Sequence, residues 1–147
     1  MNMMQQDNFK KIKDFVKQQI ITDDTVVIRP IGHGFKVNRY TIAEEQESWI
    51  VYDQHGDKIQ SFFSRKYAVL AAVLLSKNRR GDILSLKTMD QQLSIASNDQ
   101  VHYERLLQKK CSDQAESVYI ARLSKAKQIL ESVRSQVREL EKSLQLQ

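Results

Sequence analysis

Three histidines and one cysteine are the side chains with the most obvious chemical potential in this 147-residue sequence. His33 stands between two glycines, an arrangement that could serve a phosphate-binding or metal-binding loop. The spacing matches neither G-x-G-x-x-G nor a P-loop, and no Lys-Ser/Thr pair follows. His55 and His102 have no Cys or His neighbour at ligand spacing. The sequence therefore predicts no metal and no cofactor.

Acidic residues supply the other candidates for chemistry. Asp53, Gly56 and Asp57 suggest a calcium loop, but the Asp spacing is wrong and Ser64 occupies the twelfth position, where a bidentate Glu belongs. Asp23-Asp24 and Glu44-Glu45 fall in polar loops, where solvated charge is the expectation. Cys111 has no His base that can be placed beside it. We expect no enzymatic activity.

Composition narrows the class of protein further. The chain is 41% hydrophobic with four Gly and one Pro, which suits an ordinary folded domain. A single cysteine gives no reason to expect an oxidising compartment. The longest apolar run, Tyr67–Leu75, has nine residues, whereas a membrane span needs about 20. Because the start of the chain also lacks the hydrophobic region of a signal peptide, we expect a protein that is neither secreted nor membrane-spanning.

Residues 1–81 read as a small α+β head. An amphipathic helix is predicted over residues 4–20, and a β-branched strand over 25–29 stopped by Pro30. A second strand is expected over 35–43, with Phe35 and Val37 on one face and Tyr40 and Ile42 on the other. Residues 49–53 and 58–63 form a hairpin around Gly56. Ser64 then caps a buried apolar helix over 65–78, with Gly81 as the stop.

Basic residues gather at both ends of that helix. If the protein binds a nucleic acid, we expect the head to be the part that binds it. Residues 1–81 carry 13 basic and 9 acidic side chains, whereas 82–147 carry 10 and 9. Near aromatic residues on a sheet, such cations could bind phosphates while bases stack. The nucleic-acid candidates are Arg65, Lys66, Lys77, Arg79 and Arg80. Their simpler interpretation is structural, as charges that offset the helix dipole.

Residues 82–147 contain no Gly and no Pro and predict a long antiparallel helical hairpin. Apolar residues in its second half alternate steps of four and three, the a/d repeat of a coiled coil. They are Tyr119, Leu123, Ala126, Leu130, Val133, Val137, Leu140 and Leu144. The first half answers with a seam from Leu86 to Leu107. The turn is expected near Cys111-Ser112, with Ser112 as N-cap and Asp113 and Glu116 in the first turn of the second helix.

Further apolar residues lie outside this narrow seam. They are Ile83, Leu84, Ile95, Val101, Leu106, Ile120 and Ile129. Such a surplus indicates that either the head or a second copy packs along the hairpin. The residues predicted to form the interaction face are Leu123, Leu130, Val133, Val137, Leu140 and Leu144.

Three stretches together resemble small hypothetical proteins of marine tailed bacteriophages, cyanophages in particular. They are Trp49–Asp53 with Gly56, Phe62–Ala68, and the terminal pair Tyr119–Ser124 and Glu139–Leu144. The resemblance covers about residues 49–145. It implies a phage-encoded viral protein that acts in the cytoplasm of the infected cell or belongs to the virion. It implies no known activity and no functional residues.

Together these observations predict an α+β protein with an N-terminal helix, a small antiparallel sheet of about four strands, one buried helix and the helical hairpin. Residues 1–81 form the head, and residues 82–147 form a hairpin that packs on it or projects from it as part of one structural unit. The leading hypothesis is a non-enzymatic structural or interaction protein that self-associates as a homo-oligomer or binds a protein partner through the hairpin. The alternative is an accessory protein that binds nucleic acid through the basic head.

Overall fold

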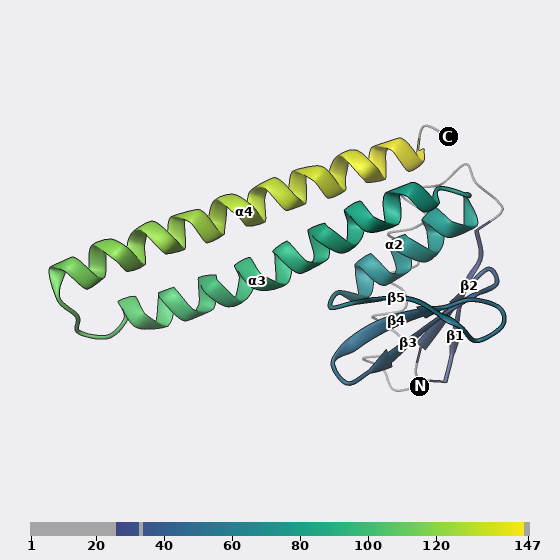
Figure 1. Cartoon of the computed structure of the whole chain (residues 1–147), viewed down its shortest axis with the longest axis horizontal. Helices are drawn as coiled ribbons and strands as arrows, with labels where there is room; N and C mark the ends of the chain where they lie inside the picture. Colours follow the sequence, from purple (N-terminus) through teal and green to yellow (C-terminus); the bar gives the residue numbers. More distant parts are fainter. Residues whose placement is uncertain (1–25, 33, 146–147) are drawn as a thin grey trace.

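The computed structural model of this chain describes residues 26–32 and 34–145, with the side chain of residue 145 left aside. The described residues form five strands and three α-helices, and Figure 1 shows their arrangement. The elements are β1 (Ile28–Ile31), β2 (Gly34–Val37), β3 (Tyr40–Glu45), β4 (Ser48–Tyr52), β5 (Lys58–Phe62), α2 (Arg65–Ser76), a 3-10 turn (Arg80–Asp82), α3 (Ile83–Leu107) and α4 (Asp113–Gln145). The predicted α+β class is confirmed. The helix expected over 4–20 and His33 lie outside the described residues.

The strands form one antiparallel sheet in the order β1-β2-β3-β4-β5, so each strand pairs with its neighbour in sequence. Helix α2 packs across one face of this sheet and contacts β2, β3, β4 and β5. Phe35, Val37, Ile42, Val51 and Phe62 are buried on that face against α2. The sheet and α2 are the described part of the head predicted over residues 1–81, and from here on we use the name head for these elements.

The single strand expected over 35–43 is wrong, because the chain reverses in its middle. Asn38 takes a φ of 53°, a left-handed conformation that Asn tolerates better than most residues, and Val37 pairs directly with Tyr40. The two-residue turn moves Tyr40 and Ile42 onto the same buried face as Phe35 and Val37. The predicted split of these residues between two faces is therefore also wrong, and the sheet has five strands instead of about four.

The first strand begins later than predicted and does not stop at Pro30. Pro30 lies within β1 and pairs with Phe35. This position is possible because β1 is an edge strand, where one missing N–H is tolerated.

On the next strand, a Cβ added to Gly34 would lie 1.9 Å from the backbone oxygen of Ile42. Only glycine allows β2 and β3 to approach so closely here.

The hairpin over 49–63 is confirmed by the pairing of β4 with β5. Gly56 has a φ of 84°, as the turn requires. Asp53 is part of the same turn, since its carboxylate accepts hydrogen bonds from the N–H groups of His55 at 2.8 Å and Asp57 at 3.0 Å. These backbone donors, Asp57 first, lower the pKa of Asp53.

Helix α2 is buried as predicted, but different residues end it. Ser64 occupies the N-cap position without a side-chain capping bond. At the other end, Asn78 has a φ of 61° and donates its N–H to Leu75, while Arg79 donates its N–H to Leu74 at 2.8 Å. This pair of bonds is a Schellman motif with Asn78 in the left-handed position that was expected of Gly81.

Helices α3 and α4 run antiparallel side by side, joined by a loop at residues 108–112 (Figure 1). Ser112 caps α4 as predicted, because its Oγ accepts the N–H of Ala115 at 3.1 Å. The C-terminal part of α4 returns to the head, where Val133, Val137 and Leu144 join the core cluster beside α2. Head and helical pair therefore share one hydrophobic core.

Candidate functional site

Among the described residues, those with catalytic or metal-binding potential do not converge. Asp53 serves its own turn, as described above, and His55 is exposed beside it. His102 lies on α3, with its ring 4.9 Å from that of Tyr103. Cys111 is half-buried in the loop between α3 and α4. Within residues 26–32 and 34–145, no group of three or more His, Cys, Asp or Glu side chains is placed to hold a metal ion.

Four of the six residues predicted as the interaction face are buried inside the molecule. Leu130, Val133, Val137 and Leu144 are covered, and Leu123 and Leu140 are partly covered. They face α3 and the core of the head, as an a/d seam does when its helical partner belongs to the same chain. Most of the predicted interaction face is therefore covered within the single chain.

Helices α3 and α4 project beyond the head. Figure 1 shows both helices running on past the sheet and α2. We define residues 94–128, all of them described, as the arm, because none belongs to the core cluster of the head or packs against it. Only Ala96 and Ala126 are fully buried in the arm, and Tyr103 approaches Tyr119 with ring centroids 6.0 Å apart. Its interior is thin for an independent unit.

Large apolar side chains are exposed on the arm and next to it. Among the seven off-seam residues, Ile83 is buried and Leu106 and Ile129 are partly covered. Leu84, Ile95, Val101 and Ile120 are exposed to solvent. Val118 is also exposed but was missed by sequence analysis. It precedes Ile129 by about three helical turns, and this regular spacing was the signal that could have found it.

The basic nucleic-acid candidates are separated and largely engaged in the fold. Arg65 stacks over Trp49 at 5.5 Å, and the Nζ of Lys66 lies 3.1 Å from Oε1 of Glu141. Arg79 binds Asp82 at 2.7 Å and donates to Ser143 at 2.9 Å. Lys77 is half-buried after α2, and Arg80 is exposed beyond it. Nucleic-acid binding stays a prediction that no contact described here supports.

The aromatic residues of the sheet do not form the stacking platform that single-stranded nucleic acid would need. Phe62 is buried, and Trp49 stacks on Phe35 with ring centroids 6.2 Å apart. Tyr52 points to the other face of the sheet from Trp49 and donates its hydroxyl to Glu45 at 2.8 Å. Only Phe63 is widely exposed. Base stacking on several neighbouring rings is therefore not available among the described residues.

A polar groove of about 690 Å³ lies where the start of α2 meets α3 and α4. Its walls include Lys66, Tyr67, Arg134, Arg138 and Glu141. Burial raises the pKa of the Tyr67 hydroxyl to about 12, with the nearby carboxylates of Asp90 and Glu141 acting in the same direction. Tyr67 therefore keeps its proton at neutral pH and is a poor base.

Asp90 supports the wall of this groove and is 1% exposed. Its Oδ2 accepts the N–H of Phe63 at 2.8 Å, and its Oδ1 accepts the N–H of Ser64 at 3.0 Å. Burial raises the pKa of Asp90, while the two N–H donors and Lys87 oppose that effect. Both carboxylate oxygens are thus used to join α3 to the start of α2, so the groove is built around structural bonds.

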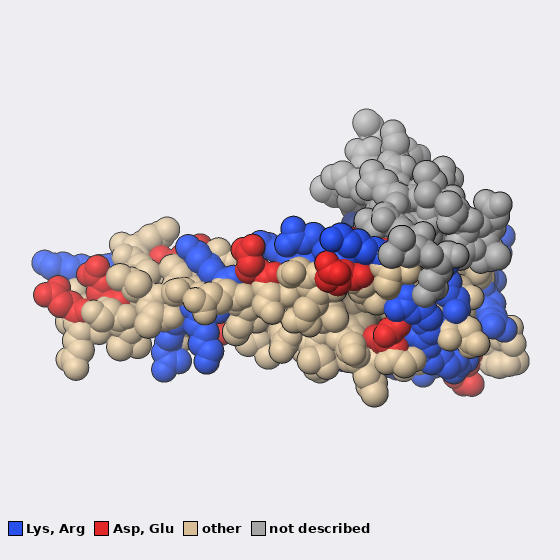
Figure 2. Space-filling view, turned by 90° about the horizontal axis from the view of Figure 1, so that it is seen from above, with Lys and Arg blue, Asp and Glu red and all other residues tan. Residues whose placement is uncertain are grey.

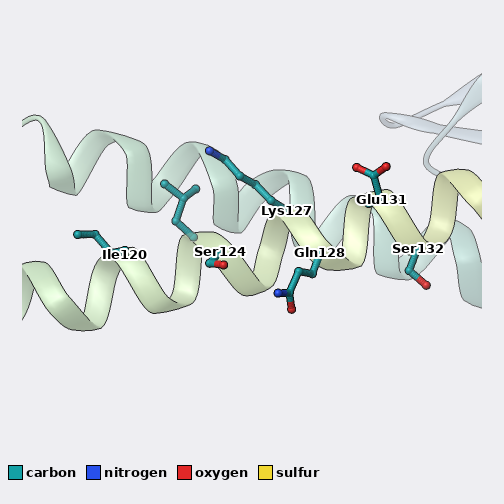
Figure 3. A pocket seen from close by; sticks show the side chains of 7 residues that line it. Ile120, Ser124, Lys127, Gln128, Glu131 and Ser132 are labelled. Carbon is teal, nitrogen blue, oxygen red and sulfur yellow. The ribbon is translucent and has the colours of Figure 1, made fainter.

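A second hollow, of about 620 Å³, follows one side of α4 between Ile120 and Ser132. Figure 3 shows that its lining side chains come from successive turns of this one helix. Lys127 and Glu131 point to one side of the helix, whereas Gln128 and Ser132 point to the other (Figure 3). Such divergent groups do not surround a small ligand.

Charge is mixed along the helical pair. On the face seen in Figure 2, Lys and Arg are interspersed with Asp and Glu along it, without a continuous field of one sign. The arm itself carries six basic and four acidic side chains. A surface of this kind is typical of protein–protein contact more than of nucleic-acid binding.

No protein-family description matches this sequence, and comparisons with curated proteins and with solved structures find no similar chain. Across residues 26–32 and 34–145, none of the helices combines the length and apolar character that crossing a bilayer requires.

Proposed function

We propose that this chain is a non-enzymatic structural or interaction protein that binds a protein partner, or a second copy of itself, through the arm. The observation that carries the proposal is the exposure of large apolar side chains on a projecting two-helix segment. Ile95 is 64% exposed and Val118 is 46% exposed, on helices whose only fully buried residues within the arm are Ala96 and Ala126. Burying such residues against a partner would remove apolar surface from water and stiffen the arm.

The arm works in this proposal as a short antiparallel coiled coil held by the head. The head fixes one end of the helical pair through the shared core, and the loop at residues 108–112 lies at the far end. A rigid base with an extended, accessible tip presents a binding surface away from the rest of the protein. The resemblance to phage proteins suggests its setting, either as a virion component or as an accessory protein in the cytoplasm of the infected cell.

Cross-linking mass spectrometry tests this proposal with lysines that the chain already has. Lys109, Lys110, Lys125 and Lys127 lie on the arm, whereas Lys58 lies on the head. A lysine-reactive cross-linker is applied to purified virions and to infected cells, and partner peptides are assigned to each lysine. We expect intermolecular cross-links to concentrate on the four arm lysines. Cross-links confined to Lys58 and other head lysines would contradict the proposal.

A shortened chain provides the matched control. Tyr103 lies opposite Tyr119, so residues 97 and 124 are nearly level, and a short turn can replace residues 98–123. This deletion leaves Leu130, Val133, Val137 and the head contacts in place. Circular dichroism checks that the shortened chain folds. The shortened chain should keep its fold but no longer associate with the partner. If it still associates, the binding surface lies outside the deleted part of the arm.

A charge at Leu130 is a poor test of association, although the sequence alone favours it. Leu130 is buried within the helical pair, so Leu130→Glu would destabilise the fold whether or not a partner binds. Substitutions at exposed residues of the arm separate the two effects.

A further inference from the structure

Six apolar residues of the helical pair form two evenly spaced rows. Leu84, Ile95 and Leu106 follow one another at a constant interval on α3, and Val118, Ile129 and Leu140 repeat the same interval on α4. This interval is close to three full turns, so each row stays on one side of its helix, with a step of roughly 16 Å. Leu84 is 74% exposed and Val118 is 46% exposed, while Leu106, Ile129 and Leu140 are partly exposed. We call these six residues the apolar strip.

The two rows share one face of the helical pair. Asp99, one turn after Ile95, lines a small hollow together with Ile129 and Lys125. Because Tyr103 lies opposite Tyr119 and the helices are antiparallel, the rows also align in level. Ile95 then lies near Ile129, and Leu106 near Val118. The apolar strip is therefore a series of three apolar pairs along the molecule.

On α3 this face points away from the head. The head holds α3 through Leu86, which is buried in the core, and through Asp90, which binds the start of α2. Leu84 is six residues before Asp90, so it projects from α3 about 120° away from it. The head leaves the apolar strip open at Leu84, Ile95 and Val118, whereas Ile129 and Leu140 are partly covered where they pack against the core cluster.

Charged groups are few on this face and are placed to complement one another. Between the apolar pairs, the same sides of the helices present uncharged Thr88, Gln91, Ser132 and Gln136. The charges near its middle are Asp99 on α3 and Arg122 and Lys125 on α4, which line the same hollow of about 240 Å³. Depletion of charge around apolar contacts is characteristic of the core of an interface.

We propose that a second copy of this chain covers the apolar strip, with the two helical pairs stacked face to face about a two-fold axis parallel to the helices. In this arrangement, α3 of each copy lies over α4 of the other. Ile95 meets Ile129 of the second copy, and Asp99 faces the second copy's Arg122 and Lys125. A self-complementary contact of this kind is what two-fold symmetry requires. This inference rests on the proposed function and specifies its partner.

The size of the face is sufficient for such a dimer. From Leu84 to Leu106 it is roughly 33 Å long, and two helices side by side are about 20 Å wide. Stacking would bury about 650 Å² on each copy, or about 1,300 Å² in total, within the range of specific protein–protein interfaces. The result is a four-helix core in which the thin interior of each arm is supported by the other.

Substitutions at exposed residues test whether the dimer forms through the apolar strip. Ile95→Lys should raise the dissociation constant of the dimer at least about tenfold in sedimentation or mass photometry. Ile120→Lys and Val101→Lys are matched controls, because these residues are similarly exposed but lie outside the apolar strip. They should leave association unchanged. Equal effects of all three substitutions, or a strict monomer at about 0.1 mM, would overturn the proposal.

Disulfide trapping tests the register. With Cys111→Ser as background, chains carrying only Leu106→Cys are mixed with chains carrying only Val118→Cys and oxidised. We expect the mixed dimer to form in preference to either homodimer. Preferential self-cross-linking of an Ile95→Cys chain would place α3 over α3 and overturn the arrangement. If the chain is monomeric but its arm lysines still cross-link to another protein, the second copy is excluded while the proposed function stands; if both fail, neither stands.

Discussion

Asp90 joins the head to the helical pair, and its replacement by alanine tests that role. The substitution removes both acceptors of the Phe63 and Ser64 N–H groups. Leaving one buried donor without an acceptor costs about 1–3 kcal/mol, and these two donors are only partly buried. Relief of the buried charge offsets part of the loss. We therefore expect Asp90→Ala to lower the free energy of unfolding by about 2–3 kcal/mol.

Chemical denaturation followed by circular dichroism measures this change. Asp90→Asn keeps one acceptor oxygen and should lose less stability than Asp90→Ala. Gln92→Ala, on the exposed side of the same helix, is the matched control and should stay within about 0.5 kcal/mol of the unmodified chain. An Asp90→Ala chain as stable as the Gln92→Ala control would refute the reasoning.

The pH dependence of stability provides a second test of the role of Asp90. Burial raises the pKa of Asp90 above 3.8, so the folded chain retains this proton at a pH where the unfolded chain has lost it. The contribution of Asp90 to stability therefore falls as the pH rises from 3.8 through its raised pKa. Asp90→Asn should remove that part of the pH dependence. A chain whose acid profile is unchanged by Asp90→Asn would show that another group is responsible.

Three further predictions concern capping, close packing and a buried hydroxyl. Ser112→Ala should lower the free energy of unfolding by about 1 kcal/mol, because the Ser112 hydroxyl caps α4. Ser64→Ala should have less effect, because the Ser64 hydroxyl makes no capping bond. Equal losses of stability in denaturant unfolding would contradict this contrast. Gly34→Ala should destabilise the sheet by about 2 kcal/mol or more, whereas Gly81→Ala meets no atom within 4 Å and should be tolerated, as thermal unfolding of both would show. Burial raises the pKa of Tyr67 from 10.0 to about 12, so stability should fall as the pH rises through that window. Tyr67→Phe should remove one late tyrosinate transition from the ultraviolet titration. A titration of all tyrosines complete near pH 10 would argue against burial of the Tyr67 hydroxyl.

The α+β class and the approximate positions of α2, α3 and α4 could be predicted because their signals are local and repeat over many residues. The a/d pattern from Tyr119 to Leu144 and the apolar run after Ser64 each extend over several turns. The seam residues are covered as the pattern implies, from Ala126 to Leu144. Long periodic segments average out single exceptions, which short strands cannot do.

The turns were harder to predict, because the residues that form them are unusual for their positions. The β2–β3 turn uses Asn38 followed by Arg39, and the β3–β4 turn uses Gln46 and Glu47, both with positive φ. Neither pair is the Asn-Gly or Asp-Gly that marks such hairpins in a sequence. The pairing of strands sets these conformations, so the fifth strand could not be counted from local residue types.

The interaction face stays a prediction, but most of its residues are covered within the chain. The a/d pattern pairs the two seams of the hairpin and cannot by itself show whether a residue such as Leu130 also meets a partner. Once α3 fills that role, the exposed apolar residues are those outside the seam. The regular interval of the apolar strip is visible in the sequence, but its meaning depends on knowing that α3 and α4 present their rows on one face.

The return of α4 to the head determines the order in which the protein can be completed. Every strand pairs with its immediate neighbour in the chain, and α3 pairs with α4 across a short loop. The contact between Arg79 and Ser143 is different, because 64 residues separate its partners. A nascent chain can thus form the sheet, α2 and α3 from local contacts, which fold quickly. During synthesis the core of the head nevertheless stays open until Val133, Val137 and Leu144 have emerged, which leaves the apolar surface of α2 as the part a chaperone would bind.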